Sequence, residues 1–198
     1  MGRRKTYVRE AVLVRAMELF WERGFHRTST RELASAMGIN VYSLYAEFGS
    51  KEGLFAAATE HYEREIVPSF IGALEREDAS LDTVLSILRF FAGRARGEGT
   101  HRGCLLCNAA VELAPDLDAS RASTEAYVER LTGAFQGALE RAQADGSLRA
   151  DADALGLARF LSTMMIGIFV LLRAQVEGAV LRAAVEHALA RLEALRAA

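Results

Sequence analysis

The sequence has little proline, little cysteine and no pattern typical of a β-strand. Two Pro and two Cys occur among 198 residues, and no run of alternating β-branched residues is long enough to predict a strand. Scarce proline in a chain dominated by Ala, Leu, Glu and Arg favours an all-helical protein. The content of 51% hydrophobic and 25% charged residues is that of a globular protein, with room for one larger or two smaller domains that share a core.

Signals for export and for membrane insertion are also absent. The first ten residues, MGRRKTYVRE, carry no apolar stretch after their charges, unlike a secretory signal. The longest uncharged run extends from Phe160 to Leu172, which is shorter than the roughly 18–20 residues that span a bilayer. Because the chain also has only two Cys, we expect a cytoplasmic protein that does not contact a membrane.

Motifs of catalysis are missing as well. The sequence has no nucleophile elbow, phosphate-binding loop or zinc motif, and its four histidines are scattered among charged residues. We therefore predict no catalytic residue, no metal and no cofactor. A helical enzyme and a helical scaffold that does not bind DNA remain as alternatives.

The net charge of −2 excludes a strongly basic protein, but the charge is unevenly distributed. Residues 1–51 contain nine Lys and Arg against five Asp and Glu, a balance of +4. Residues 52–198 contain fifteen against twenty-one, a balance of −6. A basic first segment on an acidic body indicates that only the first part contacts nucleic acid.

Two short helices joined by a tight turn are predicted over residues 28–48, TSTRELASAMGINVYSLYAEF. Ser29 and Glu32 have the spacing of a capping box, in which each side chain satisfies an amide of the other. Gly38 suits the left-handed end of the first helix, and Asn40 suits the N-cap of the second. The pattern is that of a helix-turn-helix.

The second helix of this pair has an apolar and a polar side. Leu44 and Phe48, four residues apart, are expected to point inward. Val41, Tyr42, Ser43 and Tyr45 are left on the outer side. An exposed helix with two tyrosines and few acids is typical of a helix that contacts bases and phosphates.

The rest of the chain is predicted to be helical. Helices are expected over residues 6–23, 81–96, 103–113, 120–144 and 152–177, the last with Asp151 as its cap. A further helix follows Ser50, and Pro68 should kink or end it.

The last helix carries an apolar seam that alternates four and three residues apart, at Leu181, Val185, Ala188, Leu192 and Leu195. Such a seam is typical of a coiled coil. We expect it, together with the apolar helix before it, to form a symmetric dimer interface. The alternative is packing within one subunit.

With these residues in place, the N-terminal third resembles the TetR family of bacterial transcriptional regulators. The resemblance covers roughly residues 8–56, with several elements at fixed spacing: Gly24-Phe25, Thr28-Ser29, Leu33-Ala34, Gly38-Ile39, Ser43-Leu44-Tyr45, Phe48, Lys51 and Leu54-Phe55. It implies an Ω-shaped homodimer of about nine helices per chain. The DNA-binding domain would comprise residues 1–50, and the ligand-binding and dimerisation domain residues 51–198. This sequence departs from the family pattern at Tyr42 and at Ala46-Glu47, and Glu47 would repel a phosphate if it faced the DNA backbone.

The resemblance also implies site residues. The expected contacts to pseudo-palindromic double-stranded operator DNA are Thr28, Thr30, Arg31, Asn40, Val41, Tyr42, Ser43, Tyr45 and Lys51. The expected residues around a small-molecule effector are Phe90, Phe91, Cys104, Cys107, Asn108, Glu112, Tyr127, Met164, Met165 and Phe169. Most of the apolar residues in this second set would equally fit a plain core. The function implied is a repressor that a small molecule releases from its operator.

The segment from Gly103 to Glu112 holds two further features. Its pattern GCL, then Asn108 and Glu112, resembles a motif in one branch of the family. Asn108 and Glu112 form a polar pair on an otherwise apolar helix, so each needs a partner, either a ligand or a helix end. Cys104 and Cys107 lie on one helix face near a helix N-terminus, which favours a reactive thiol. They are interpreted as structural or as a passive cavity wall, with electrophile or redox sensing and metal binding as alternatives.

Overall fold

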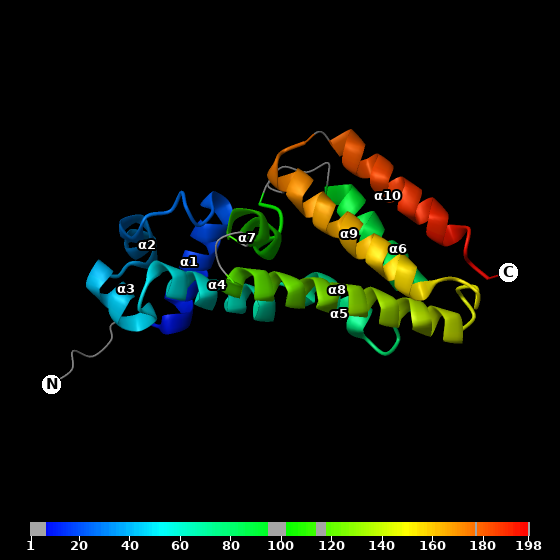
Figure 1. The fold of residues 1–198 in the computed structure, drawn as a ribbon, viewed down its shortest axis with the longest axis horizontal. Coiled ribbons are helices and arrows are strands. Elements are labelled where there is room, and N and C mark those ends of the chain that lie inside the picture. Colours follow the sequence, from blue (N-terminus) through cyan, green and yellow to red (C-terminus); the bar gives the residue numbers. More distant parts are fainter. Residues whose placement is uncertain (1–6, 95–101, 114–117, 177, 198) are drawn as a thin grey trace.

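The computed structural model describes residues 7–94, 102–113, 118–176 and 178–197, and these residues are almost entirely helical (Figure 1). Within them there are ten helices, and the one β feature is an isolated bridge between Leu148 and Arg196. The all-helical class is therefore confirmed. The helices are α1 (Arg9–Arg23), α2 (Thr30–Met37), α3 (Val41–Phe48), α4 (Lys51–Glu65), α5 (Pro68–Glu75), α6 (Leu81–Arg94), α7 (Leu105–Leu113), α8 (Asp118–Ala144), α9 (Ala154–Arg173) and α10 (Gly178–Glu193).

The first three helices form a head at one end of the molecule, and α4 joins it to the body (Figure 1). The centre of the head is a cluster of aromatic rings. The Phe20 ring, which is fully buried, lies edge-on to Phe55 with a centroid distance of 5.0 Å, and Phe25 lies 5.2 Å from Phe55. Edge-to-face packing adds to the free energy gained by burying these rings. It also ties α1 to α4, and so ties the head to the body.

Pro68 interrupts the helical run after α4, as predicted. Helix α4 ends at Glu65, and α5 begins with Pro68 at its first position. Proline suits this position because its missing N–H has no intrahelical partner there. The chain bends at this point, and α5 packs beneath α8.

Helix α8 is the longest element, and α9 packs along it (Figure 1). The cap of α9 differs from the prediction. Asp153 begins the helix by accepting a hydrogen bond from the Gly156 N–H at 2.9 Å. Asp151 instead forms an ion pair with Arg149 in the turn before it. The prediction was two residues early because both aspartates have side chains suited to capping.

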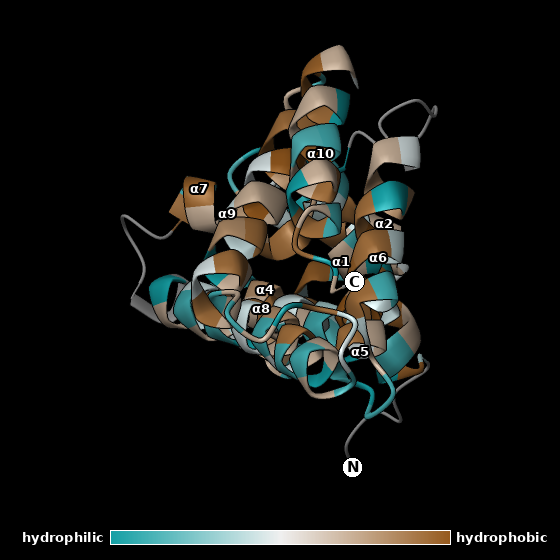
Figure 2. Cartoon of the chain, turned by 90° about the vertical axis from the view of Figure 1, so that its right-hand side faces the viewer, coloured by the Kyte–Doolittle hydropathy of each residue, from teal (hydrophilic) through white to brown (hydrophobic). Residues whose placement is uncertain are grey.

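Among the described helices, α9 is long and apolar enough to cross a membrane by length and composition. Only 39% of its most apolar window is buried inside the chain. Figure 2 shows α9 mostly in brown and tan, with teal more frequent along α8. One face of α9 packs in the core through Leu161, Met165 and Ile168, and Phe160 on another side is 49% exposed.

The seam of α10 faces the protein's own core, which contradicts the prediction of a dimer interface there. Leu181, Val185, Ala188 and Leu192 are all at most 2% exposed, and α10 packs against α6 and α9 of the same chain. A seam with this spacing needs one apolar partner surface, and the sequence does not tell whether that surface comes from the same chain. The seam residues therefore follow the intrasubunit alternative, whereas the outer faces of α9 and α10 stay the predicted contact between two copies.

Candidate nucleic-acid interface and ligand cavities

The predicted caps of α2 and α3 are present. The Glu32 N–H donates to the Ser29 hydroxyl at 3.2 Å, and the Ser29 N–H donates to the Glu32 carboxylate at 2.8 Å. Gly38 ends α2 with a φ of 69°, in the left-handed region that favours glycine. Asn40 begins α3 by accepting a hydrogen bond from the Ser43 N–H at 2.7 Å. These contacts fix the turn and the angle between the two helices.

Helix α3 buries one side and exposes its tyrosines on the other. Leu44 is fully buried in the head, whereas Tyr42 is 83% exposed and Tyr45 is 44% exposed. The burial of Leu44 sets the rotation of the helix, so the two tyrosines stand on the surface. A helix presented in this way has the dimensions to enter a major groove.

Thr28 does not reach this surface, so its predicted contact with a phosphate is wrong. The residue is fully buried, and its hydroxyl donates a hydrogen bond to the Gly24 carbonyl oxygen at 2.7 Å. It fastens the turn between α1 and α2. A residue with no exposed surface cannot contact DNA unless the head unfolds locally.

The remaining predicted DNA contacts lie on or near the surface. Arg31 and Asn40 are exposed, and Thr30, Val41 and Ser43 are partly buried. Lys51 is also partly buried, and its Nζ lies 4.2 Å from the centroid of the Phe25 ring. This cation–π contact holds the ammonium group near the start of α4.

Glu47 is turned away from the exposed side of α3. Its carboxylate accepts a hydrogen bond from the Arg9 Nε at 3.1 Å and another from the Tyr7 hydroxyl at 3.3 Å. The side chain is only 8% exposed. It therefore joins α3 to the start of α1, and its charge is balanced within the head.

An aromatic cavity of about 250 Å³ lies where α1, α4, α5, α6 and α9 meet. Phe91 and Phe169 both line it and pack edge-to-face against each other, with a centroid distance of 5.3 Å. Trp21 from the head helix also lines this cavity. The full set is Trp21, Tyr62, Ile66, Ser69, Phe70, Phe90, Phe91, Gly103, Phe169 and Leu172.

Sequence reasoning found three of these cavity residues and missed the others. Phe90, Phe91 and Phe169 were predicted, whereas Trp21 and Phe70 were not. Trp21 follows Phe20 directly, so it cannot share that residue's side of α1. A large apolar side chain off the head's buried stripe was the signal that could have identified it.

Several predicted effector contacts lie elsewhere. Cys104, Tyr127 and Met165 are buried and line neither described cavity, and Met164 is partly buried and also lies outside both. Cys107, Asn108 and Glu112 line a second cavity instead.

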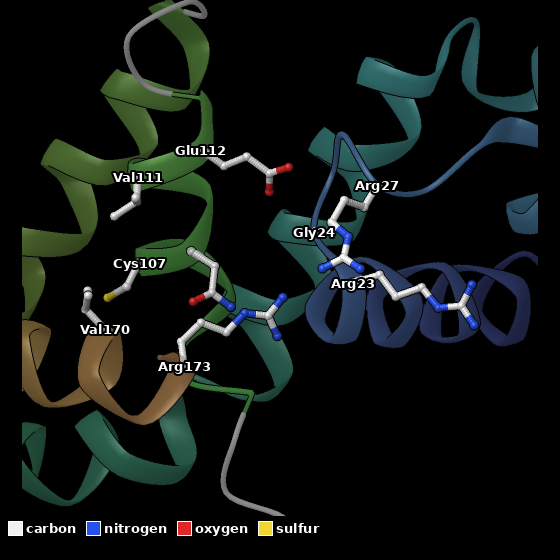
Figure 3. A pocket seen from close by; sticks show the side chains of 9 residues that line it. Arg23, Gly24, Arg27, Cys107, Val111, Glu112, Val170 and Arg173 are labelled. Carbon is white, nitrogen blue, oxygen red and sulfur yellow. The ribbon is translucent and has the colours of Figure 1, made fainter. Parts of the chain in front are cut away.

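The second cavity, of about 260 Å³, lies between the head and the body (Figure 3). Glu112 of α7 reaches across to the loop after α1, where its carboxylate accepts hydrogen bonds from the Phe25 N–H at 2.9 Å and the His26 N–H at 2.7 Å. Arg173 of α9 donates to the carbonyl oxygens of Trp21 at 3.0 Å and Glu22 at 2.8 Å. The carboxyl end of α1 is thus held from two sides by the body.

The polar pair on α7 has partners within the protein. Glu112 makes the two bonds to the head loop, and the Asn108 side-chain amide donates to the Arg102 carbonyl oxygen at 2.8 Å. Glu112 thus meets the loop that follows the carboxyl end of α1, and a ligand at either side chain stays a prediction. Both side chains are part of the connection between head and body.

The two thiols are placed unfavourably for sensing. Burial tends to raise the pKa of Cys104, but hydrogen bonds from Cys107 and from the Tyr62 hydroxyl outweigh it and lower that pKa. Cys104 is, however, fully buried. Cys107 lines the second cavity, and its hydrogen bond to Cys104 together with burial raises its pKa. Both thiols are thus buried, and the one that lines a cavity has the raised pKa, so redox or electrophile sensing is not favoured.

A possible ligand set for a metal lies where α1 meets α4 and consists of Glu10 of α1 with His61 and Glu65 of α4. The guanidinium of Arg64 stands among these residues, with Nη2 2.9 Å from the His61 Nδ1 and Nε 2.7 Å from the Glu65 carboxylate. A cation is thus already supplied by the chain, and the set gives no support for a metal.

Two family models match the chain. Residues 12–58 match "Bacterial regulatory proteins, tetR family", and residues 80–195 match "Tetracyclin repressor-like, C-terminal domain". The chain is 34% identical to the HTH-type transcriptional repressor ComR of Escherichia coli strain K12, over 84% of this chain and 80% of that protein. It is 28% identical to the HTH-type transcriptional repressor DhaR of Mycobacterium sp. strain GP1, over 87% and 85%.

A similar solved structure is that of a cysteine-substituted form of the TetR family transcriptional regulator CifR, in complex with a 26-base-pair operator DNA. It superposes with a TM-score of 0.81 at 35% identity, over 96% of this chain and 98% of that one. The helix-turn-helix head, the helical body and these matches agree with one another. The chain therefore belongs to the TetR family of bacterial regulatory proteins.

Proposed function

We propose that the protein is a DNA-binding transcriptional repressor. The observation that carries this proposal is α3: Asn40 begins it, Leu44 anchors it, and Tyr42 stands 83% exposed on its outer side. The similarity to the repressor ComR and to CifR with its operator supports the same function. The expected contacts are Tyr42 and Ser43 to base edges, Thr30, Tyr45 and Lys51 to phosphates, and Arg31 to a base or a phosphate. Asn40 and Val41 place the helix.

We further propose a head of residues 1–50 and a body of residues 51–198. The chain turns at Gly49 and Ser50, and the Ser50 hydroxyl caps α4 by accepting from the Gly53 N–H at 3.0 Å. The protein would act in the cytoplasm, without catalysis, metal or cofactor, since the relatives reported above are regulators.

The active form is proposed to be a homodimer that binds a pseudo-palindromic operator. The outer face of α9, with Phe160 49% exposed, and Val180 at the start of α10, 55% exposed, offer apolar surface for a second copy. Pairing two copies along α9 would place two α3 helices on one face of the dimer. Two such helices about 34–36 Å apart reach successive major grooves of B-DNA.

The aromatic cavity is the proposed effector site, and its walls favour a neutral aromatic molecule. Phe91 and Phe169 offer ring faces, and Ser69 offers a hydroxyl. Trp21 belongs to α1, and its indole N–H donates to the Gly103 carbonyl oxygen at 3.2 Å. An effector that displaces Trp21 would therefore move the head. The effector can weaken DNA binding by no more than the difference between its binding free energies for the displaced and the DNA-bound state.

The pattern GCL, Asn108 and Glu112 supports membership of the family branch with that motif. Its residues have connected roles: Gly103 accepts from Trp21, Asn108 holds the Arg102 carbonyl, and Glu112 holds the head loop. We infer that the motif preserves the contact between head and body rather than direct ligand recognition.

The proposal predicts different results for two substitutions in the head. Tyr42→Ala should change the preference among operator sequences, because its contact is with bases. Lys51→Ala should weaken binding to all sequences about equally and lower the salt slope by about one unit. Both are measured by gel-shift titration against the DNA upstream of the protein's own gene, with Arg76→Gln as an exposed control. A Tyr42→Ala protein with lower affinity and unchanged preference would contradict the base contact.

The effector site predicts a fluorescence signal, because Trp21 is the single tryptophan of the chain. Neutral aromatic compounds are screened for release of operator DNA. Each compound that releases DNA should shift Trp21 emission over the same concentration range. Release by a saturating compound that leaves Trp21 emission unchanged would show that the effector binds elsewhere.

A further inference from the structure

The cavity between head and body is lined by charged side chains, and none of these belongs to the proposed effector site. Its apolar wall consists of Val111 of α7 and Val170 of α9, with the Cys107 thiol beside them (Figure 3). Its polar side carries Arg23, Arg27 and Arg173 against the single carboxylate of Glu112. An occupant that suits these walls has a short apolar part and a negative charge.

The arginines are not equally available. Arg23 forms an ion pair with Glu32 at 3.0 Å, and in Figure 3 its guanidinium points away from the other side chains. Arg27 and Arg173 point into the space between α1 and α7 (Figure 3). The two hydrogen bonds from Arg173 to the carbonyls of α1 both use Nη1. The guanidinium therefore keeps other N–H groups for a ligand, since it carries five donors in a fixed fork.

The loop after α1 already binds a carboxylate. The N–H groups of Phe25 and His26 each bond one oxygen of Glu112, at 2.9 and 2.7 Å. Each amide thus binds one oxygen of the same carboxylate, and guanidinium groups lie nearby. Such an arrangement of donors is suited to binding a planar anion. The loop amides therefore bind the Glu112 carboxylate. Among the described residues that line this cavity, no other carboxylate is present to pair with Arg27 and Arg173.

We propose that this cavity binds a small organic carboxylate, distinct from the neutral effector of the aromatic cavity. The carboxylate lies between Arg27 and Arg173, and its apolar part packs on Val111 and Val170. Arg173 is the link to the head, because it also holds the carbonyl oxygens of Trp21 and Glu22. A ligand that recruits Arg173 competes with those bonds and loosens the carboxyl end of α1.

The test is calorimetric titration of the full-length protein with benzoate, in the absence of DNA. Benzamide serves as the neutral molecule of nearly the same shape. Saturable binding of benzoate with at least about tenfold weaker binding of benzamide is expected, because a charge-assisted hydrogen bond is worth roughly twice a neutral one. Equal binding of the two compounds, or binding of neither, would overturn the proposal. A failure of DNA binding would leave this measurement unaffected, so the two proposals fail separately.

Variants that are expected to weaken benzoate binding, and one expected to strengthen it, distinguish an anion site from a purely structural role. Arg27→Gln and Arg173→Gln should each weaken benzoate about tenfold, because each removes one charged donor. Glu112→Gln should tighten it several-fold, since it removes the negative charge of Glu112 that repels the ligand carboxylate in the cavity. Arg76→Gln, an arginine on the exposed loop between α5 and α6, is the matched control and should leave affinity unchanged.

One further variant separates ligand loss from misfolding. Val111 is 69% exposed at the edge of the cavity, so Val111→Trp should fill the cavity while the Arg173 and Glu112 bonds to the head stay in place. It should abolish benzoate binding with little change in thermal stability. Unchanged binding in this variant, or a weakened rather than tightened Glu112→Gln, would contradict the site.

Discussion

Replacing Phe160 with Glu is expected to leave the protein monomeric and to lower its affinity for a two-half-site operator at least about a hundredfold. Phe160 is 49% exposed on α9, whose most apolar window is only 39% buried within the chain. A pair of carboxylates facing each other across a symmetric interface would have to be desolvated beside apolar surface. Each monomer would then bind one half-site alone, without the gain in affinity that comes from joining two DNA-binding heads in one dimer.

Sedimentation and gel-shift titration measure the two parts of this prediction. Val111→Glu is the matched control, because Val111 is also an exposed apolar residue, on α7, and should leave the protein dimeric. The circular dichroism of Phe160→Glu should stay that of the wild type, because the substitution is made at the surface. A dimeric Phe160→Glu protein would show that α9 is not the contact between copies.

The second large effect is expected at Gly103, where Ala should lower the free energy of unfolding by about 2–5 kcal/mol. Gly103 has a φ of 63°, a conformation that costs an L-residue about 1–2 kcal/mol. A Cβ there would also lie 2.6 Å from the Phe169 carbonyl oxygen, which is backbone in α9 and cannot turn aside. Crowding of this kind adds about 1–3 kcal/mol.

Gly146→Ala is the matched control, because Gly146 has a φ of 79° and a Cβ on it would meet nothing within 4 Å. It should cost only the backbone strain, about 1–2 kcal/mol. Urea unfolding of both variants gives the comparison. The Gly103 carbonyl also accepts from Trp21, so Gly103→Ala should weaken effector-induced release. Equal destabilisation by the two substitutions would show that the close approach of the Phe169 carbonyl oxygen adds nothing to the cost of Gly103→Ala.

The head could be derived from the sequence because its signals are local. Ser29, Glu32, Gly38 and Asn40 act on neighbouring amides, and the structure shows each of them in its predicted role. The apolar anchor Leu44 followed from helical spacing. Thr28 was misread because a hydroxyl at the start of a helix can face solvent or bond back four residues, and the spacing is the same in both cases.

The body was harder to predict because its contacts join distant segments. Glu112 meets amides at 25 and 26, and Arg173 meets carbonyls at 21 and 22. Nothing in the sequence near either residue indicates these partners. The seam of α10 raised the same difficulty, because spacing shows that Leu181 and Val185 share a side but not which chain covers it. Trp21 was missed because its hydrogen bond to Gly103 also joins distant segments of the chain.

The measurement that tests the central claim most directly is the binding of purified dimer to operators whose half-site spacing is varied. For half-sites one helical turn apart, we expect the dimer to bind with an affinity well beyond the non-specific range of about 10⁻⁴–10⁻⁶ M at physiological salt. Adding half a turn between them should abolish that gain, because the second α3 would then face the opposite side of the duplex. Affinity that stays in the non-specific range at every spacing, or that ignores the spacing, would contradict the account.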